Sequence, residues 1–240
     1  MVFVFDIDGT LTPSRQKMDS EFLEFMLDFA DKNNVWLITG SDLDKTIQQI
    51  GLELWEKVDR AYQLAGNELW VNGVMSYTNR LVLPDDYKAE LNRLVETSQW
   101  KEHYGNHIEE RGALVNFSVV GRDCTQEQRE AYYKWDQQSN ERSRYVKYLN
   151  EKFPDYEISK GGEISMDIYP KGRNKGQIVD KLEGERFIFF GDQLVSGGND
   201  KPIFDRIKET NAQGKCIQVE NWMATYDFLK NEQYNNIIWE

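Results

Sequence analysis

The amino-acid sequence predicts an α/β fold in which a second α/β domain is inserted into the first. Short apolar strands alternate with amphipathic helices near both ends of the 240-residue chain, which is typical of a mainly parallel sheet. From about residue 81 the order changes to a helix, two strands, a long helical region and another strand. We therefore expect a core domain of residues 1–80 and 171–240 and an inserted domain of residues 81–170.

The first strand of the predicted core covers residues 2–5 and leads into Asp6, Asp8 and Gly9. Side chains alternate along a strand, so both carboxylates leave the same face, where one could attack phosphorus and the other could transfer the proton. Gly9 allows a sharp turn without a Cβ clash. Because Asp and Gly are also ordinary turn residues, this motif alone is equally consistent with a simple strand end.

A strand-helix-strand unit follows. Apolar residues recur at helical spacing over residues 22–29, and residues 35–38 form a short apolar strand. Ser41 is placed to cap the next helix, and Gly51 is placed to end it. Asn72-Gly73 between apolar residues predicts a hairpin.

The core pattern returns after the insert. Lys175 precedes a helix, and the strand of residues 187–190 leads into Asp192 and a loop that contains Asp200. Ligands bind beyond the carboxyl ends of the strands in open α/β sheets, which is where these acidic residues fall. Carboxylates gathered there are stable together chiefly when a cation neutralises them, and oxygen ligands beside phosphate indicate Mg²⁺. Lys175 would offset the remaining charge, although a lone lysine before a helix is more often solvated.

The predicted insert contains two strands with one apolar and one polar face. Residues 115–119 alternate apolar and polar side chains, and residues 164–168 alternate in the same way, so we expect their polar faces to be open to a cleft or to water. Residues 125–128 form a capping box that begins a helix. Arg122 is an even number of residues after Asn116 and Ser118, so its side chain could leave the same polar face. A bulge at Gly121 would spoil this count.

Composition and charge exclude several classes of partner. The 29 Lys and Arg against 41 Asp and Glu give a formal net charge of -12, which disfavours non-specific binding to nucleic acid or to an anionic membrane. Cys124 and Cys216 lie far apart and suit a reducing compartment. We find no leader pattern and no run of about 20 apolar residues. We therefore expect a soluble cytoplasmic protein that acts on small molecules.

Together these motifs resemble the haloacid dehalogenase superfamily and, within it, the eukaryotic-type phosphomannomutases. The resemblance covers most of residues 1–204 and is carried by residues 6–17, 40–42, 111–129, 161–167 and 189–200. It implies a Rossmann-like haloacid dehalogenase core with an inserted α/β cap domain that binds the sugar phosphate.

The resemblance also implies a role for each site residue. Asp6 would be the nucleophile that becomes an aspartyl phosphate, Asp8 the general acid and base, and Lys175 the residue that steadies the phosphoryl group. Mg²⁺ would be held by Asp6, the backbone carbonyl of Asp8 and Asp192, with Asp200 nearby. The substrate-binding residues would be Arg15, Ser41, Arg111, Arg122, Arg129, Ser165 and Asp167. Arginine suits this role because its planar fork matches phosphate oxygens.

The implied reaction interconverts mannose 1-phosphate and mannose 6-phosphate through the aspartyl phosphate and a hexose bisphosphate. The implied cofactors are Mg²⁺ and hexose 1,6-bisphosphate as activator, and a homodimer through the cap is also implied. A Mg-dependent sugar-phosphate phosphatase of the same superfamily is an alternative, because the two reactions differ only in whether a sugar hydroxyl or water removes the phosphoryl group. Thr39, where the mutases tend to have Gly, favours that alternative.

A third reading is a non-catalytic protein on the same fold. Loss of a catalytic carboxylate would favour it, and none is lost. One further departure lies in residues 205–210, where the family carries a proline-containing segment that binds a cation and this chain does not. That difference argues against a second structural cation.

Overall fold

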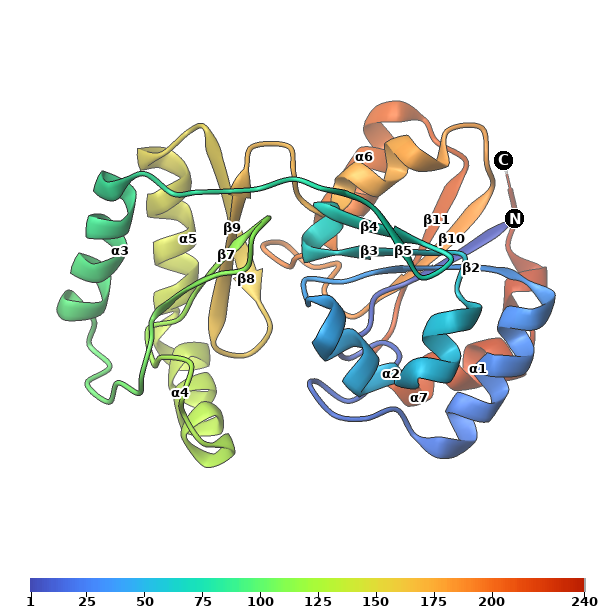
Figure 1. Ribbon diagram of the computed structural model, residues 1–240, viewed down its shortest axis with the longest axis horizontal. Helices are drawn as coiled ribbons and strands as arrows, with labels where there is room; N and C mark the ends of the chain where they lie inside the picture. The colour runs from blue at the N-terminus through green and yellow to red at the C-terminus, as the bar shows by residue number, and fades with distance from the viewer. Residues whose placement is uncertain (240) are drawn as a thin grey trace. The chain divides into compact units, whose positions relative to one another are not determined.

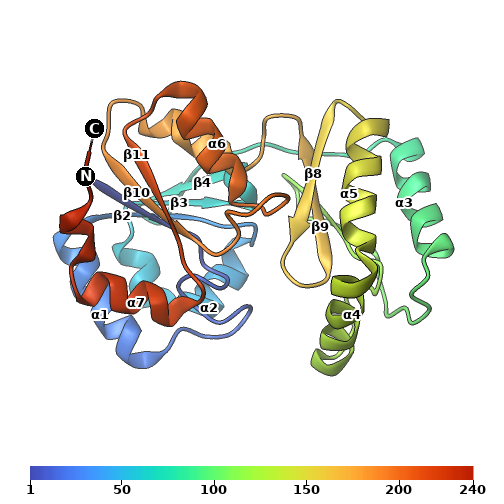
Figure 2. The same cartoon turned by 180° about the vertical axis from the view of Figure 1, so that it is seen from behind.

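The structure is a computed structural model that describes residues 1–239 and divides into two compact units (Figures 1 and 2). The core unit comprises Met1–Tyr77, Lys175–Ser196 and the described chain from Asp200 onward. The insert unit comprises Thr78–Asn174 together with Gly197–Asn199. Each unit has its own sheet and hydrophobic core.

The core unit is built on a seven-stranded sheet of order β11-β10-β1-β2-β3-β4-β5. Its strands are β1 (Val2–Phe5), β2 (Asn34–Ile38), β3 (Arg60–Gln63), β4 (Glu68–Val71), β5 (Val74–Thr78), β10 (Phe187–Gly191) and β11 (Gly214–Gln218). Strand β1 pairs in parallel with both β2 and β10, β2 pairs in parallel with β3, and β10 pairs in parallel with β11. Because β1 lies between β2 and β10, the loop after β1 is at the centre of the sheet edge.

Both faces of this sheet are covered. Helices α1 (Ser20–Lys32), α2 (Leu43–Lys57) and α7 (Trp222–Lys230) pack on one face, and the 3₁₀ segment η2 (Lys175–Leu182) and α6 (Lys201–Thr210) pack on the other (Figure 2). The apolar strands are therefore buried on both sides, which explains their continuous apolar runs. Short 3₁₀ turns, η1 (Leu64–Gly66) and η3 (Gln233–Asn236), complete the unit.

Helix α2 differs from the prediction at both ends. Asp42, not Ser41, is its N-cap and accepts a hydrogen bond from the backbone N–H of Lys45. Gly51 leaves helical geometry at φ 78°, but the helix resumes and continues to Lys57. The side chain of Ser41 is therefore available for the site described below.

The insert unit is a four-stranded antiparallel sheet of order β6-β7-β9-β8 with three helices. Its elements are α3 (Asp85–Thr97), β6 (Ile108–Glu110), β7 (Val115–Phe117), α4 (Gln126–Ser139), α5 (Glu141–Lys152), β8 (Tyr156–Gly161) and β9 (Ser165–Pro170). The capping box at Thr125 is confirmed, and Asn140, at φ 54°, separates the two halves of the expected long helical region.

Two features of the insert unit differ from the prediction. Strand β8 was not expected, because Ile158 is its only fully buried apolar residue and gives little periodic signal. The polar faces of β7 and β9 are not open to water: Asn116 is 2% exposed and donates a 2.6 Å hydrogen bond to Asp167 on the neighbouring strand. Asn116 and Asp167 thus pair with each other and not with water.

No helix of the described chain has both the length and the apolarity needed to cross a membrane.

Candidate active site

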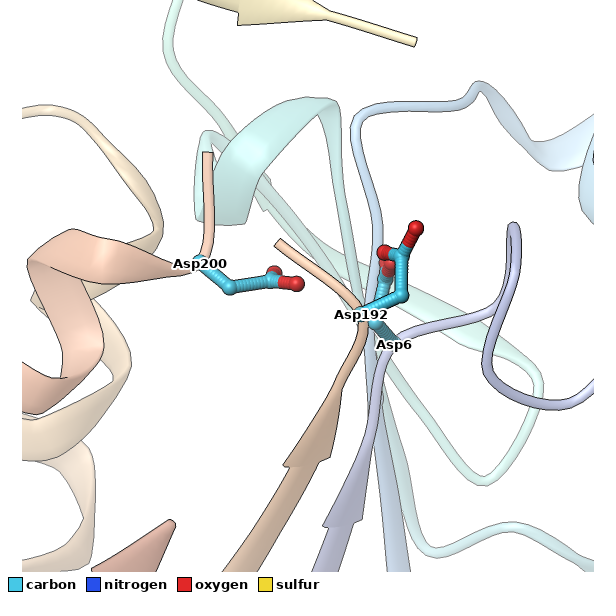
Figure 3. A group of neighbouring side chains, drawn as sticks. All are labelled: Asp6, Asp192 and Asp200. Atoms are coloured by element: carbon cyan, nitrogen blue, oxygen red, sulfur yellow. The ribbon is translucent and has the colours of Figure 1, made fainter. Parts of the chain in front are cut away.

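Three aspartates converge where β1 and β10 end. Asp6 follows β1, Asp192 follows β10, and Asp200 precedes α6 (Figure 3). One carboxylate oxygen from each lies within 4.8 Å of the others. Asp6 and Asp200 are almost completely buried, and Asp192 is partly buried. An acidic cluster in such a position requires positive charge nearby.

Lys175 supplies part of that charge. Its Nζ donates 2.7 Å hydrogen bonds to Oδ1 of Asp6 and to Oδ1 of Asp200, and its side chain is 1% exposed. The second carboxylate oxygen of Asp200 accepts a hydrogen bond from the backbone N–H of Gln193. Lys175 is thus a fixed part of the cluster and not a surface lysine, since it begins η2 facing the strand ends.

The aspartate cluster is electrostatically incomplete. Burial raises the pKa of Asp6 well above its ordinary value, against the opposing charge of Lys175. Burial, followed by the charge of Asp200, raises the pKa of Asp192 to about 6. Three carboxylates and one ammonium group give the cluster a net negative charge. The atoms that it offers to a metal ion are all carboxylate oxygens. These residues fit a hard divalent cation such as Mg²⁺.

Two glycines allow this close approach. A Cβ on Gly9, whose φ is +82°, would lie 2.6 Å from Oδ2 of Asp192. A Cβ on Gly191 would lie 2.6 Å from Oδ2 of Asp200. Any larger residue at either position would push an aspartate out of the cluster.

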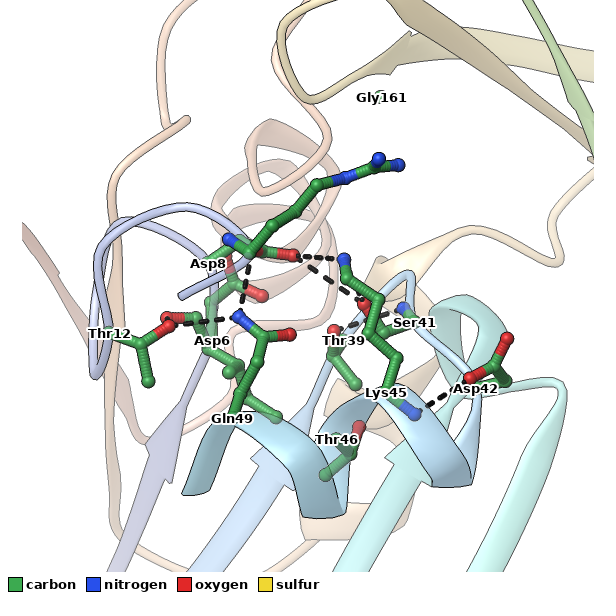
Figure 4. Close-up of polar contacts among 12 residues, drawn as sticks. Asp6, Asp8, Thr12, Thr39, Ser41, Asp42, Lys45, Thr46, Gln49 and Gly161 are labelled. Carbon is green, nitrogen blue, oxygen red and sulfur yellow. Dashed lines mark hydrogen bonds and ion pairs between the residues drawn. The ribbon is translucent and has the colours of Figure 1, made fainter. Parts of the chain in front are cut away.

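Asp8, in the same loop, has its own set of hydrogen-bond donors (Figure 4). Its Oδ2 accepts from Lys45 Nζ at 3.0 Å and from Ser41 Oγ at 3.5 Å. Its Oδ1 accepts from the backbone N–H of Arg15 at 2.6 Å and from Gln49 Nε2 at 3.0 Å. Each oxygen of Asp8 thus has two donors, which fixes its orientation.

These donors outweigh the effect of burial on Asp8. Burial alone would raise the pKa of Asp8, but the charge of Lys45 and the hydrogen bonds from Arg15, Lys45 and Gln49 lower it. The pKa values of Asp6 and Asp8 are therefore shifted in opposite directions. The two neighbouring carboxyl groups thus lie in electrostatically different surroundings.

Sequence reasoning missed Lys45 and Gln49. They lie one turn apart on α2 and face Asp8 together, and Gln49 also donates to Thr12 Oγ1 at 3.0 Å. The signal was their spacing of four residues directly after the Ser41 loop. The hydroxyl of Thr39 accepts a hydrogen bond from the backbone N–H of Ser41, so it shapes this loop.

The insert unit contains a second charged cluster. Arg111 donates to Oε2 of Glu109 through Nε at 3.0 Å and Nη2 at 2.7 Å, and Arg122 Nε lies 3.0 Å from the same oxygen. Strand β7 ends at Phe117, so the parity argument for Arg122 does not apply, yet the following loop still brings it to Arg111. Burial, followed by the charge of Arg111, lowers the pKa of Arg122.

Two of the remaining predicted residues of the insert, Arg129 and Asp167, act electrostatically on Arg122. Arg129 on α4 forms an ion pair with Glu163 at 3.3 Å. Its charge helps to lower the pKa of Arg122, whereas the charge of Asp167 opposes that shift. Ser165 Oγ donates to the backbone carbonyl of Gly161 at 2.6 Å. The structure therefore groups the predicted residues within each unit, and it adds Glu109 and Glu163 as acidic partners that the sequence did not reveal.

Comparison with known proteins identifies the family. A family model described as eukaryotic phosphomannomutase matches residues 22–220. A protein named phosphomannomutase from Galdieria sulphuraria is 35% identical over 210 residues, which cover 84% of this chain and 84% of the relative. A protein of the same name from Encephalitozoon cuniculi is 32% identical over 215 residues, which cover 85% and 84%.

Solved structures with lower sequence identity share the fold. A haloacid dehalogenase-like hydrolase from Bacteroides thetaiotaomicron has a TM-score of 0.58 at 13% identity and covers 96% of this chain and 98% of that one. An IMP-nucleotidase from Plasmodium falciparum has a TM-score of 0.61 at 16% identity and covers 97% and 68%. These likenesses establish the haloacid dehalogenase fold alone. Because the family match spans most of the sequence, the chain belongs to the eukaryotic phosphomannomutase family and is an enzyme of that type.

Proposed function

We propose that the protein interconverts mannose 1-phosphate and mannose 6-phosphate and that Asp6 carries the phosphoryl group in a covalent aspartyl phosphate. The observation that carries this proposal is the buried Asp6, which accepts a 2.7 Å hydrogen bond from Lys175 beside Asp192 and Asp200, in a chain of the phosphomannomutase family. In this proposal Asp6 attacks phosphorus and Asp8 moves the proton.

The two half-reactions use the same groups in opposite directions. A carboxylate oxygen of Asp6 attacks one phosphorus of a hexose bisphosphate, and the sugar oxygen that leaves takes a proton from Asp8. In the return step a hydroxyl of a hexose monophosphate attacks the aspartyl phosphate, gives its proton to Asp8 and releases Asp6 as a carboxylate. Lys175 stabilises the negative charge around Asp6 throughout. Hexose 1,6-bisphosphate is then the activator, because it loads Asp6.

The residues fit Mg²⁺ as the cofactor. Asp6, Asp192 and the backbone carbonyl of Asp8 would hold it, and Asp200 would support them through Lys175 and Gln193. When bound, the ion would neutralise charge on the transferring phosphoryl group.

The insert unit is proposed to act as the cap of residues 81–170 that binds the sugar phosphate. Arg111, Arg122 and Arg129 supply the cationic donors for phosphate, with Arg15 of the core unit, and Ser41 contacts the transferring phosphoryl group. Ser165 and Asp167 would bind sugar hydroxyls, and a homodimer would form through this unit. The free thiols of Cys124 and Cys216 suit the reducing cytoplasm.

The decisive test measures two products from one reaction. Mannose 1-phosphate is incubated with the enzyme, Mg²⁺ and a trace of hexose bisphosphate, while mannose 6-phosphate and inorganic phosphate are followed in parallel. We expect isomer formation to exceed phosphate release by a large factor. Phosphate release far above isomerisation for every hexose phosphate tested would replace the mutase with a phosphatase.

Removal of divalent metal is expected to abolish turnover. Addition of Mg²⁺ to the chelated protein should also raise its melting temperature, because the ion binds the folded state alone. Asp192→Asn should remove most of this thermal shift, whereas Asp155→Asn, an exposed aspartate of the insert, should preserve it. An equal rise in melting temperature in the parent protein and in both variants would mean that the ion binds elsewhere.

Lys45→Met is expected to move the acidic limb of the pH–rate profile. Lys45 lowers the pKa of Asp8, so its loss raises that pKa, and Asp8 becomes protonated, and inactive as a base, at a higher pH. The limb of kcat/KM should therefore shift upward by about one pH unit. Lys57→Met, at the far end of the same helix, is the matched control. An unmoved limb in Lys45→Met would mean that Asp8 does not titrate in the rate-determining step.

A further inference from the structure

The arginine cluster of the insert unit is nearly neutral by itself. Three arginines face three acids, and the members are Arg111, Arg122, Arg129, Glu109, Glu163 and Asp167. A phosphate dianion that enters the cluster must therefore compete with carboxylates that are already there. One of these carboxylates must leave its arginine when phosphate binds.

Glu109 and Glu163 are held very differently. Glu109 accepts two hydrogen bonds from Arg111 and lies 3.0 Å from Arg122, so it aligns both guanidinium groups. Glu163 makes one contact of 3.3 Å with Arg129 Nη2, and its side chain is 33% exposed. Water would therefore compensate Glu163 readily when it leaves Arg129, whereas the departure of Glu109 would release two arginines.

Arg129 retains unused binding capacity. Its side chain is only 8% exposed, and its buried Nε has no hydrogen-bond partner among the described residues. Nη1 of Arg122 is buried and likewise has no hydrogen-bond partner among the described residues. Buried donors without acceptors cost free energy, so the cluster gains when an anion with several oxygens binds.

The backbone that carries Glu163 does not depend on its side chain. Glu163 lies in the turn between β8 and β9, where Arg142 Nη1 donates to the carbonyls of Gly162 at 2.8 Å and Ser165 at 3.2 Å. Arg142 is itself fixed by a buried ion pair with Asp136 at 2.8 Å. Replacing Glu163 should thus leave the turn in place.

We propose that Glu163 is an internal counter-ion that competes with the substrate phosphate for Arg129 and so sets the affinity of the cap for phosphate. This proposal rests on the assignment of the insert unit as the phosphate-binding cap. Substrate binding then exchanges the carboxylate of Glu163, which returns to water, for a phosphate with more acceptor oxygens. The carboxylate holds Arg129 in place between turnovers and weakens substrate binding.

The test uses two acid-to-amide substitutions with opposite expected effects. Glu163→Gln should lower the KM for mannose 1-phosphate about two- to fivefold and tighten the binding of inorganic phosphate by a similar factor, because it removes the competing charge. Glu109→Gln should raise the KM, because Arg111 and Arg122 lose their common anchor. The gain in Glu163→Gln should shrink as salt is added.

Controls separate this effect from a general change in charge. Glu130→Gln removes one negative charge from the exposed side of α4 and should leave the KM and phosphate binding unchanged. In an Arg129→Met background, Glu163→Gln should have no effect on phosphate binding, because its partner is absent. An unchanged or higher KM in folded Glu163→Gln, or a gain that persists without Arg129, would overturn the proposal.

Calorimetry with inorganic phosphate keeps this proposal separate from the proposed function. It reports on the full chain without turnover. Tighter phosphate binding by Glu163→Gln in a protein that does not isomerise mannose 1-phosphate would support the counter-ion and refute the mutase. Normal isomerisation with identical phosphate binding in both proteins would refute the counter-ion alone.

Discussion

Asp6→Asn is expected to abolish isomerisation, with a loss of at least about 10⁴-fold in kcat, because an amide cannot form the aspartyl phosphate. The fold should remain intact. The asparagine keeps an oxygen that accepts from Lys175, and it removes a buried carboxylate whose raised pKa shows that its ionised form is costly. The melting temperature at pH 7 should therefore equal or exceed that of the parent protein.

The matched control for this change is Asp28→Asn on the exposed side of α1. It should retain full activity, so that loss in Asp6→Asn is assigned to the site. Activity is followed by mannose 6-phosphate formation and folding by circular dichroism. Residual turnover above about one part in a hundred, in protein freed of reverted asparagine, would exclude Asp6 as the nucleophile.

Lys175→Met should have the largest effect on stability. The ammonium is buried between Asp6 and Asp200, and its removal leaves both carboxylates without a cationic partner in a buried site. Breaking a buried pair in this way costs about 3–5 kcal/mol of unfolding free energy. Urea unfolding in the presence of a chelator measures the loss, and Mg²⁺ should restore part of it by supplying positive charge at the same place.

A double variant tests the cause of that loss. Lys175→Met with Asp200→Asn should be more stable than Lys175→Met alone, because one of the two unpaired charges is gone. Replacing the exposed Lys171, in Lys171→Met, should change stability little. If Lys175→Met costs less than about 1 kcal/mol, the lysine does not hold the cluster together.

The position of the core site could be predicted from the sequence because it depends on strand ends. Asp6, Asp8 and Asp192 each follow a recognisable apolar strand, and parallel strands bring their carboxyl ends to one edge. The structure gathers Asp6, Asp192 and Asp200 there, together with Lys175, which the sequence analysis had also named. Strand order accounts for Asp6 and Asp192, whereas Asp200 and Lys175 lie at the starts of α6 and η2 and were named from the combined motif.

The partners of these residues could not be predicted in the same way. Lys45 and Gln49 contact Asp8 from a helix 37 and 41 residues away, and their role depends on how that helix rotates against the sheet. Glu109 and Glu163 are ordinary acidic residues until the fold places arginines beside them. Hydrophobic periodicity reports which face of an element is buried, but it does not report which polar groups meet across it.

The pairing of β1 with β10 has a consequence for synthesis on the ribosome. Phe5 lies beside Phe190 in the sheet, so β1 lacks one neighbour until almost four-fifths of the chain has been translated. Until then a strand of four buried apolar residues has an open edge, which is a site for aggregation. A nascent chain arrested within the insert would therefore be prone to aggregate. We expect chaperones to bind β1 until β10 has been synthesised.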